Sequence, residues 1–166
     1  MITAICPGSF DPITLGHVDI IRRAADMFDH VIVAVLRNAK KNASFTIEER
    51  MEMIRKVVAD MPDVNVEVDT FDGLLADYAK IKNATVLVKG LRAVTDFEYE
   101  FQMALANRRL NPDLETVFIT TRAENMYLAS SLVKEIARGG GSISDFVPAV
   151  VREEIQNRLC KGEIEK

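Results

Sequence analysis

Short apolar runs alternate along this chain with segments in which apolar residues recur every three or four positions. The runs are rich in β-branched residues and lie at 2–6, 31–36, 64–68, 85–88 and 116–120. Such nearly continuous apolar character is typical of parallel strands that are covered on both faces of a sheet. We therefore predict five strands from these runs.

The segments between the runs have helical periodicity, and they lie at 16–28, 47–60, 74–82, 95–109, 131–138 and 148–159. Thr46 and Glu49 predict a capping box at the start of the second one. Strands that alternate with helices imply right-handed crossover connections. We predict an α/β fold, a single-domain Rossmann-like doubly wound sheet of about five parallel strands with flanking helices, over residues 1–166.

In such sheets, ligands bind beyond the carboxyl ends of the strands, at the point where the strand order reverses. The stretch "GSFDPITLGH" (8–17) follows the first predicted strand. Gly8 allows the backbone to approach a ligand, and Ser9 and Phe10 offer backbone N–H groups. Gly16 and His17 lie at the start of a helix, where unpaired N–H groups favour anions.

The same stretch lacks two common nucleotide-binding patterns. It has no G-x-G-x-x-G, and no P-loop lysine follows it. Asp11 lies beside Pro12, and we interpret it as a brace of the loop rather than as a general base.

Composition limits the class of protein further. The 166 residues carry a net charge of −4, whereas a protein that binds duplex nucleic acid is usually strongly basic. Small anionic ligands need only a few local cations. The two cysteines, Cys6 and Cys160, lie far apart and predict reduced thiols rather than a disulfide framework or a metal site. We expect a cytoplasmic protein with no signal peptide and no membrane span.

Two clusters of cations follow predicted strands. Arg37, Lys40 and Lys41 follow the second strand, and they fit either a solvated loop or a cationic arm over a phosphate. Lys89 and Arg92 flank a glycine after the fourth strand, and they fit either exposed surface cations or a phosphate-binding pair.

Two further segments follow the third and fifth strands. Gly73 is a candidate helix start, and Leu75 behind it fits a core position. After the fifth strand, Ser130 or Ser131 is the expected N-cap of a helix, whose N-terminus is an anion site.

The stretch 8–17 resembles the signature of the nucleotidyltransferase superfamily, whose members carry a T/H-x-G-H element. Here that element is Thr14-Leu15-Gly16-His17. The longer pattern resembles the phosphopantetheine adenylyltransferase family. Three other stretches agree, "FTIEER" (45–50), "VLVKGLRAVTDFEYEFQMALANRRL" (86–110) and "SSLVKEIARGGGSISDFVP" (130–148), so the resemblance covers nearly the whole chain.

The resemblance implies transfer of AMP from ATP to the phosphate of 4′-phosphopantetheine, which gives dephospho-coenzyme A and pyrophosphate. The acceptor phosphate is already ionised at neutral pH, so we expect no general base; positioning and charge stabilisation are enough. Mg²⁺ is expected to bridge phosphate oxygens, with few protein ligands. The resemblance also implies a homohexamer and feedback binding of coenzyme A.

It further implies roles for individual residues. The expected catalytic residues are His17, Lys41 and Arg92. The expected acceptor-binding residues are Ser9, Lys41 (with Lys40 as the alternative), Leu75 and Lys89. The residues expected to bind ATP are Ser9, Phe10, His17, Gly90, Leu91, Arg92, Glu100, Asn125, Met126, Tyr127, Leu128, Ala129, Ser130 and Ser131. The chain departs from the family at Lys89, where arginine is frequent, and at Ala129, where the first of three serines is usual.

Two alternatives stay open at this point. A related nucleotidyltransferase would use CTP or another phosphorylated acceptor, and the first signature does not separate these enzymes. A non-catalytic nucleotide sensor would keep the fold without the reaction. The presence of Ser9, His17, Lys41, Lys89 and Arg92 together argues against the sensor.

Overall fold

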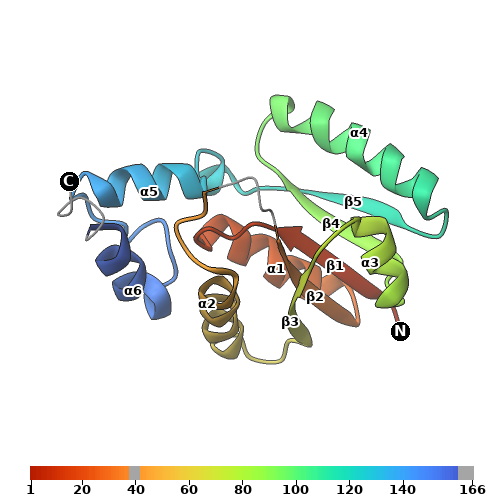
Figure 1. Ribbon diagram of the computed structural model, residues 1–166, viewed down its shortest axis with the longest axis horizontal. Coiled ribbons are helices and arrows are strands. Elements are labelled where there is room, and N and C mark those ends of the chain that lie inside the picture. Colours follow the sequence, from red (N-terminus) through yellow and green to blue (C-terminus); the bar gives the residue numbers. More distant parts are fainter. Residues whose placement is uncertain (38–41, 161–166) are drawn as a thin grey trace.

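The described residues form one parallel sheet with helices on both faces (Figure 1). The computed structural model describes residues 1–37 and 42–160. The strands are β1 (Thr3–Gly8), β2 (His30–Leu36), β3 (Val66–Phe71), β4 (Val86–Leu91) and β5 (Glu115–Thr120), and their order is β3-β2-β1-β4-β5. Every pairing is parallel. The predicted fold class is confirmed.

The helices are α1 (Leu15–Met27), α2 (Ile47–Ala59), α3 (Leu75–Ile81), α4 (Val94–Leu110), α5 (Ser130–Arg138) and α6 (Ala149–Cys160), with a short 3-10 helix, η1 (Ala123–Asn125). The predicted capping box of α2 is confirmed. The Glu49 N–H donates to Thr46 Oγ1 at 3.1 Å, and the Thr46 N–H donates to Glu49 Oε2 at 2.8 Å.

Several strand and helix boundaries differ by one to three residues from the sequence-based expectation. β1 continues to Gly8 and β4 to Leu91, because pairing with β2 and β5 carries both strands past their apolar runs. β3 begins later and includes Asp69 and Thr70, which an edge strand accommodates because one of its sides is unpaired. α3 begins at Leu75, after Gly73 at a φ of 89°.

Two apolar cores cover the two faces of the sheet. Successive side chains of β1 point to opposite faces of the sheet. Ala4 and Cys6 therefore pack in one core, and Ile5 packs in the other. The first core takes buried side chains from α1, α2, α5 and α6, and the second takes them from α3. Both faces of the central strand are thus buried, as its sequence predicts.

The strand order reverses between β1 and β4. From β1 the chain continues to β2 and β3 on one side, and β4 then pairs with the other edge of β1 and leads to β5. The carboxyl ends of β1 and β4 therefore meet at the point where α/β proteins bind ligands. The residues that follow these two strands are the ones singled out by the sequence.

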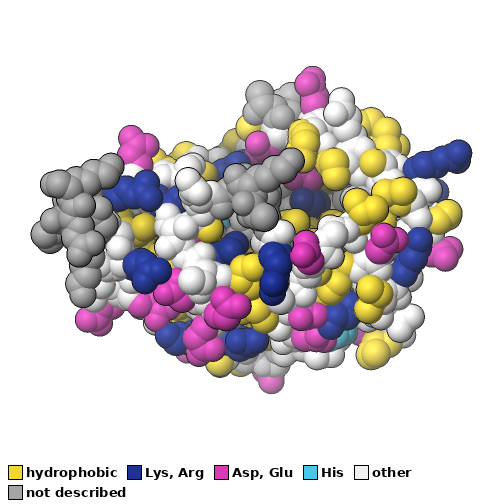
Figure 2. Space-filling view, viewed as in Figure 1, with side chains coloured by type: hydrophobic (Ala, Val, Ile, Leu, Met, Phe, Trp, Pro, Cys, Tyr) yellow, Lys and Arg dark blue, Asp and Glu magenta, His cyan; other side chains and the backbone are white. Residues whose placement is uncertain are grey.

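Acidic and basic side chains are interspersed over the face shown in Figure 2. Hydrophobic side chains gather on that face over the part of the molecule formed by α3 and α4. Over residues 1–37 and 42–160, no helix has the length and apolar character needed to cross a membrane.

Candidate functional site

The loop from Ser9 to Thr14 connects β1 to α1 and carries the first candidates. Phe10 is buried at a φ of 47°, and its ring lies edge-on to the His17 ring with centroids 5.0 Å apart. A Cβ at Gly8 would lie 2.9 Å from the Phe10 ring. Gly8 is therefore required for Phe10 to fold back under the loop, and this arrangement leaves Ser9 exposed at the end of β1.

The T-x-G-H element forms a second capping box. The Thr14 N–H donates to His17 Nδ1 at 3.0 Å, and the His17 N–H donates to Thr14 Oγ1 at 3.4 Å. Histidine thus takes the position that glutamate or glutamine usually occupies in this motif. Because Nδ1 accepts a hydrogen bond, the hydrogen-bond network assigns the ring proton to Nε2.

The imidazole of His17 is neutral at physiological pH. Burial of the ring, and secondarily the positive charge of Arg92, lower the pKa of His17 to about 4. A neutral ring that is fixed through Nδ1 can donate one hydrogen bond through Nε2. Such a donor suits an oxygen that gains negative charge during a reaction.

Arg92 links the end of β4 to the segment after β5. Its Nη1 donates to the Leu128 carbonyl at 3.2 Å, and its Nε lies 3.3 Å from the Asp96 carboxylate. A Cβ at Gly90 would lie 2.9 Å from Ile20 Cγ1 in α1. Gly90 therefore allows β4 and α1 to lie close together, which brings Arg92 toward His17.

Lys89 and Glu100 form an ion pair of 3.2 Å between β4 and α4. The resemblance assigns these side chains to different substrates, the acceptor and ATP. In the structure each is about one-fifth exposed, at 22% and 21%, so the pair is partly shielded from water. A phosphate that binds Lys89 would have to compete with this carboxylate.

Residues 125–131 lie beside the T-x-G-H element. A Cβ at Gly16 would lie 3.9 Å from both Asn125 Cβ and Leu128 Cδ2, and Leu128 is buried. Met126 and Tyr127 are exposed, at 52% and 59%. This segment can therefore present side chains and backbone groups to a ligand above α1.

The expectation of a serine N-cap on α5 is wrong. Ala129 occupies the N-cap position and makes no side-chain cap, while α5 begins at Ser130. The Ser130 hydroxyl instead donates to the Pro12 carbonyl at 2.8 Å. Ser130 and Ser131 thus lie in the first turn of a helix whose N-terminus is fixed to the β1–α1 loop.

The other predicted site residues lie at three different places. Leu91 ends β4 and is half-buried. Leu75 begins α3, beyond the edge strand β3, and packs with Leu36 against the second core. Lys41 and its alternative Lys40 lie outside the described residues.

Two cations that the sequence analysis did not select also hold the loop. Arg50 in α2 is buried, and its Nη1 donates to the Ser9 carbonyl at 2.8 Å. Lys134 in α5 forms a 2.9 Å ion pair with Asp11. The sequence analysis did not predict the capping box of Thr14 and His17, although their spacing of three residues is the signal that could have indicated it. The contacts of Arg50 and Lys134 join segments that are distant in sequence, so no local spacing could have paired them.

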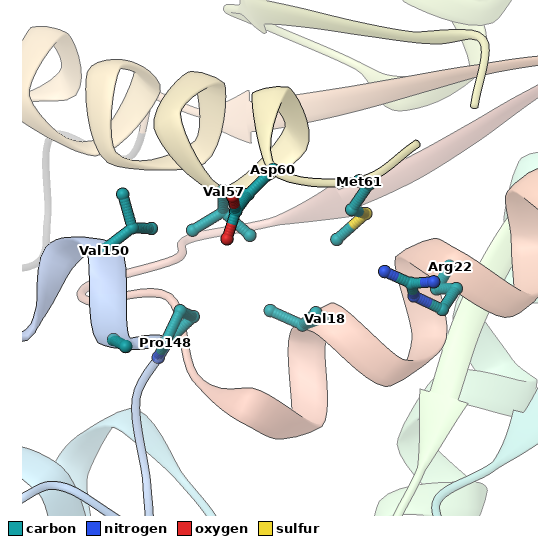
Figure 3. A pocket seen from close by; sticks show the side chains of 8 residues that line it. Val18, Arg22, Val57, Asp60, Met61, Pro148 and Val150 are labelled. Carbon is teal, nitrogen blue, oxygen red and sulfur yellow. The ribbon is translucent and has the colours of Figure 1, made fainter. Parts of the chain in front are cut away.

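A small surface cavity of about 110 Å³ lies between α1, α2 and α6 (Figure 3). Its lining residues are Val18, Arg22, Val57, Asp60, Met61, Pro148, Ala149 and Val150. None of the predicted site residues lines it. The candidate site is instead the region at the adjacent ends of β1 and β4. Ser9, His17 and Arg92 follow these strands, and Lys89 lies near the end of β4.

Comparisons with known proteins show which family the chain resembles. The family model described as cytidylyltransferase-like matches residues 5–136. A phosphopantetheine adenylyltransferase of Caldanaerobacter subterraneus subsp. tengcongensis is 56% identical over 98% of this chain and 100% of that protein. One from Alkaliphilus metalliredigens is 53% identical over 95% of this chain and 99% of that protein.

Solved structures share the fold at low sequence identity. Nicotinic acid mononucleotide adenylyltransferase of Plasmodium falciparum, complexed with NaAD, matches with a TM-score of 0.69 and 13% identity over 98% of this chain and 96% of that one. A putative nicotinate-nucleotide adenylyltransferase of Vibrio parahaemolyticus matches with a TM-score of 0.65 and 18% identity over 95% of this chain and 96% of that one.

We expect the His17 ring to stay neutral, with its proton on Nε2, as the pH falls from 7 toward 4. The cause is the pKa of about 4 that burial and Arg92 impose. Unfolded chains take up this proton near pH 6.5, so His17 should destabilise the folded state progressively as the pH falls from 6.5 to about 4. Ring nitrogen chemical shifts in an NMR titration, assigned with a His17→Asn variant, measure this. A midpoint near 6.5 for His17 would contradict the structure.

Proposed function

The chain belongs to the phosphopantetheine adenylyltransferases, within the cytidylyltransferase-like family, and we propose that the site at the ends of β1 and β4 performs the reaction of that family. AMP is transferred from ATP to the phosphate of 4′-phosphopantetheine, a step of coenzyme A biosynthesis. The observation that carries the residue assignment is the fixed, neutral His17 donor beside Arg92.

In the proposed reaction, a phosphate oxygen of 4′-phosphopantetheine attacks the α-phosphorus of ATP. A new P–O bond forms, the bond between the α-phosphorus and the bridging oxygen breaks, and pyrophosphate leaves. His17 Nε2–H donates to an α-phosphate oxygen as its negative charge grows. The acceptor phosphate needs no base, because it is already ionised.

The surrounding cations and N–H groups hold the substrates in line. Lys89, together with Lys41, would bind the acceptor phosphate, and Ser9 would lie between the two substrates. Arg92 and the first turn of α5 would bind the β- and γ-phosphates. Leu75 would contact the pantetheine arm, and the segment 125–129 would enclose the adenine.

We also propose Mg²⁺ as the metal of this reaction. Among the described residues, no group of three or more His, Cys, Asp or Glu side chains could hold a metal ion. Asp96 and Glu100 are engaged by Arg92 and Lys89. The metal would therefore be held mainly by phosphate oxygens and water, and it would offset part of the triphosphate charge.

Two further proposals concern location and regulation. The free thiols of Cys6 and Cys160 support a cytoplasmic location. Coenzyme A, which contains both a pantetheine arm and an adenine nucleotide, would bind the same site as a feedback inhibitor.

The reaction is tested by offering each nucleotide with each acceptor. We expect dephospho-coenzyme A and pyrophosphate from ATP, Mg²⁺ and 4′-phosphopantetheine, with mass spectrometry as the readout. CTP in place of ATP, and nicotinate mononucleotide in place of the acceptor, should give far less product. ATP binding without release of pyrophosphate would favour a nucleotide sensor instead.

His17→Ala should lower kcat by about 10²–10³-fold, as expected for the loss of one preorganised donor, and should change KM much less. His17→Gln can place an amide N–H near the position of Nε2 and should retain more activity than His17→Asn, whose amide reaches only the position of Nδ1. His30→Ala is the matched control, because His30 begins β2 and faces Glu67. Unchanged kcat with raised KM would contradict the role of His17.

The exposed apolar side chains of α4 support a homo-oligomer, and we propose the hexamer that the family resemblance implies. Six large hydrophobic side chains of α4 are each at least 38% exposed: Phe97, Tyr99, Phe101, Met103, Leu105 and Leu110. Single exposed apolar side chains are ordinary, but six on one helix, with Phe97 and Phe101 stacked at a centroid distance of 5.5 Å, favour a covered surface. A further copy of the chain would cover it.

Light scattering should therefore report an assembly of about six chains for the purified protein. Leu105→Glu should reduce the measured mass, because it places a charge on this apolar surface. Glu98→Gln, which changes an exposed side chain of the same helix, should leave the mass unchanged. A monomeric wild-type protein would refute the proposal.

A further inference from the structure

The carboxylate of Asp11 joins three segments that are distant in sequence. Its Oδ1 accepts a hydrogen bond from the Phe45 N–H at 3.0 Å, and its Oδ2 accepts one from the Ser44 N–H, also at 3.0 Å. The Lys134 ammonium donates to Oδ2 at 2.9 Å. Asp11 itself is 7% exposed, so these interactions are largely shielded from water.

Each of the three segments leads into part of the proposed site. Asp11 lies in the loop between Ser9 and His17. Residues 44–46 precede α2 and lead to Arg50, which holds the Ser9 carbonyl. Lys134 lies one turn into α5, whose first residue, Ser130, donates to the Pro12 carbonyl. The loop is therefore attached to α2 at Ser9 and Asp11, and to α5 at Asp11 and Pro12.

Lys134 is the only partner of Asp11 among these that carries a charge. Two backbone N–H groups and one ammonium satisfy both oxygens of an ionised carboxylate. A buried carboxylate that lost its ammonium partner would keep its charge with less compensation. The position of α5 relative to the loop thus depends on both members of the pair.

We propose that Asp11 and Lys134 act together as a positioning pair for the adenylyl transfer. They hold the N-terminus of α5 in a fixed position relative to the loop that precedes His17. The N-terminus of α5 is assigned to the leaving phosphates, and His17 to the α-phosphate. Neither side chain touches the substrates. This inference rests on the proposed function, because it assumes that the two segments bind parts of one ATP molecule.

The pair is tested with Lys134→Met, which removes the ammonium but leaves both backbone hydrogen bonds to Asp11 in place. We expect kcat to fall by about 10–100-fold, as for a small misplacement of reacting groups, while KM for ATP changes less than about threefold. Lys134→Arg should restore most of the lost kcat, since it keeps a donor and a charge. Asp11→Asn should lower kcat by a similar factor.

A double variant distinguishes one joint role from two separate ones. If the two side chains act as a unit, Asp11→Asn with Lys134→Met should lose little more kcat than either single variant. Lys56→Met is the matched control, because it breaks a 2.6 Å ion pair between α2 and α6, with Glu154. It should leave kcat unchanged. Circular dichroism and thermal melting confirm that each variant is folded at the assay temperature, and Lys134→Met decides the question if Asp11→Asn does not fold.

Four results would overturn the proposal. A lower melting temperature with unchanged kcat would make the pair structural only. A raised KM for ATP with unchanged kcat would make Lys134 a direct phosphate ligand. A wild-type enzyme that forms no dephospho-coenzyme A would refute the proposed function and this inference with it, whereas an active wild type with unaffected variants refutes the inference alone.

Discussion

The reciprocal hydrogen bonds between Thr14 and His17 determine how the site is built. A capping box normally serves only to begin a helix, and here it also fixes a titratable ring. Because the Thr14 N–H occupies Nδ1, the ring presents Nε2–H away from the helix. Burial then keeps the ring neutral. One local motif therefore sets the orientation and the tautomer of the proposed donor, while burial and Arg92 set its charge.

Packing of α1 in the first apolar core places this motif beyond the carboxyl end of β1. α1 packs through Ile20, Ile21 and Ala24 on one face of the sheet, which fixes its N-terminus beyond β1. Gly90 lets β4 approach Ile20 closely. The reversal of strand order between β1 and β4 then brings Arg92 to the same end of the sheet. Packing thus supplies the proximity that the proposed chemistry requires.

Three cations at or beside the site are paired with carboxylates. Lys89 is paired with Glu100, Arg92 with Asp96, and Lys134 with Asp11. These pairs compensate positive charge that would otherwise accumulate at the ends of β1 and β4. A phosphate group bound there, as proposed, would have to replace a carboxylate at Lys89 and Arg92. Asp11 is more deeply buried than Glu100 or Asp96 and would keep its ammonium partner.

The sequence by itself determined the fold class, the alternation of elements and the position of the T-x-G-H element at the start of the first helix. These features depend on local periodicity and on capping, which act over a few residues. It also predicted Asp11 as a brace but not its partner.

Only the tertiary structure decided which distant groups meet. The anchoring of Ser9 by Arg50, the pairing of Lys89 with Glu100, the ion pair of Asp11 with Lys134 and the redirection of Ser130 from a cap to the Pro12 carbonyl all depend on how helices pack on the sheet. Each joins segments through space, and the periodicity of a single chain carries no information about which of its many polar side chains will be neighbours there.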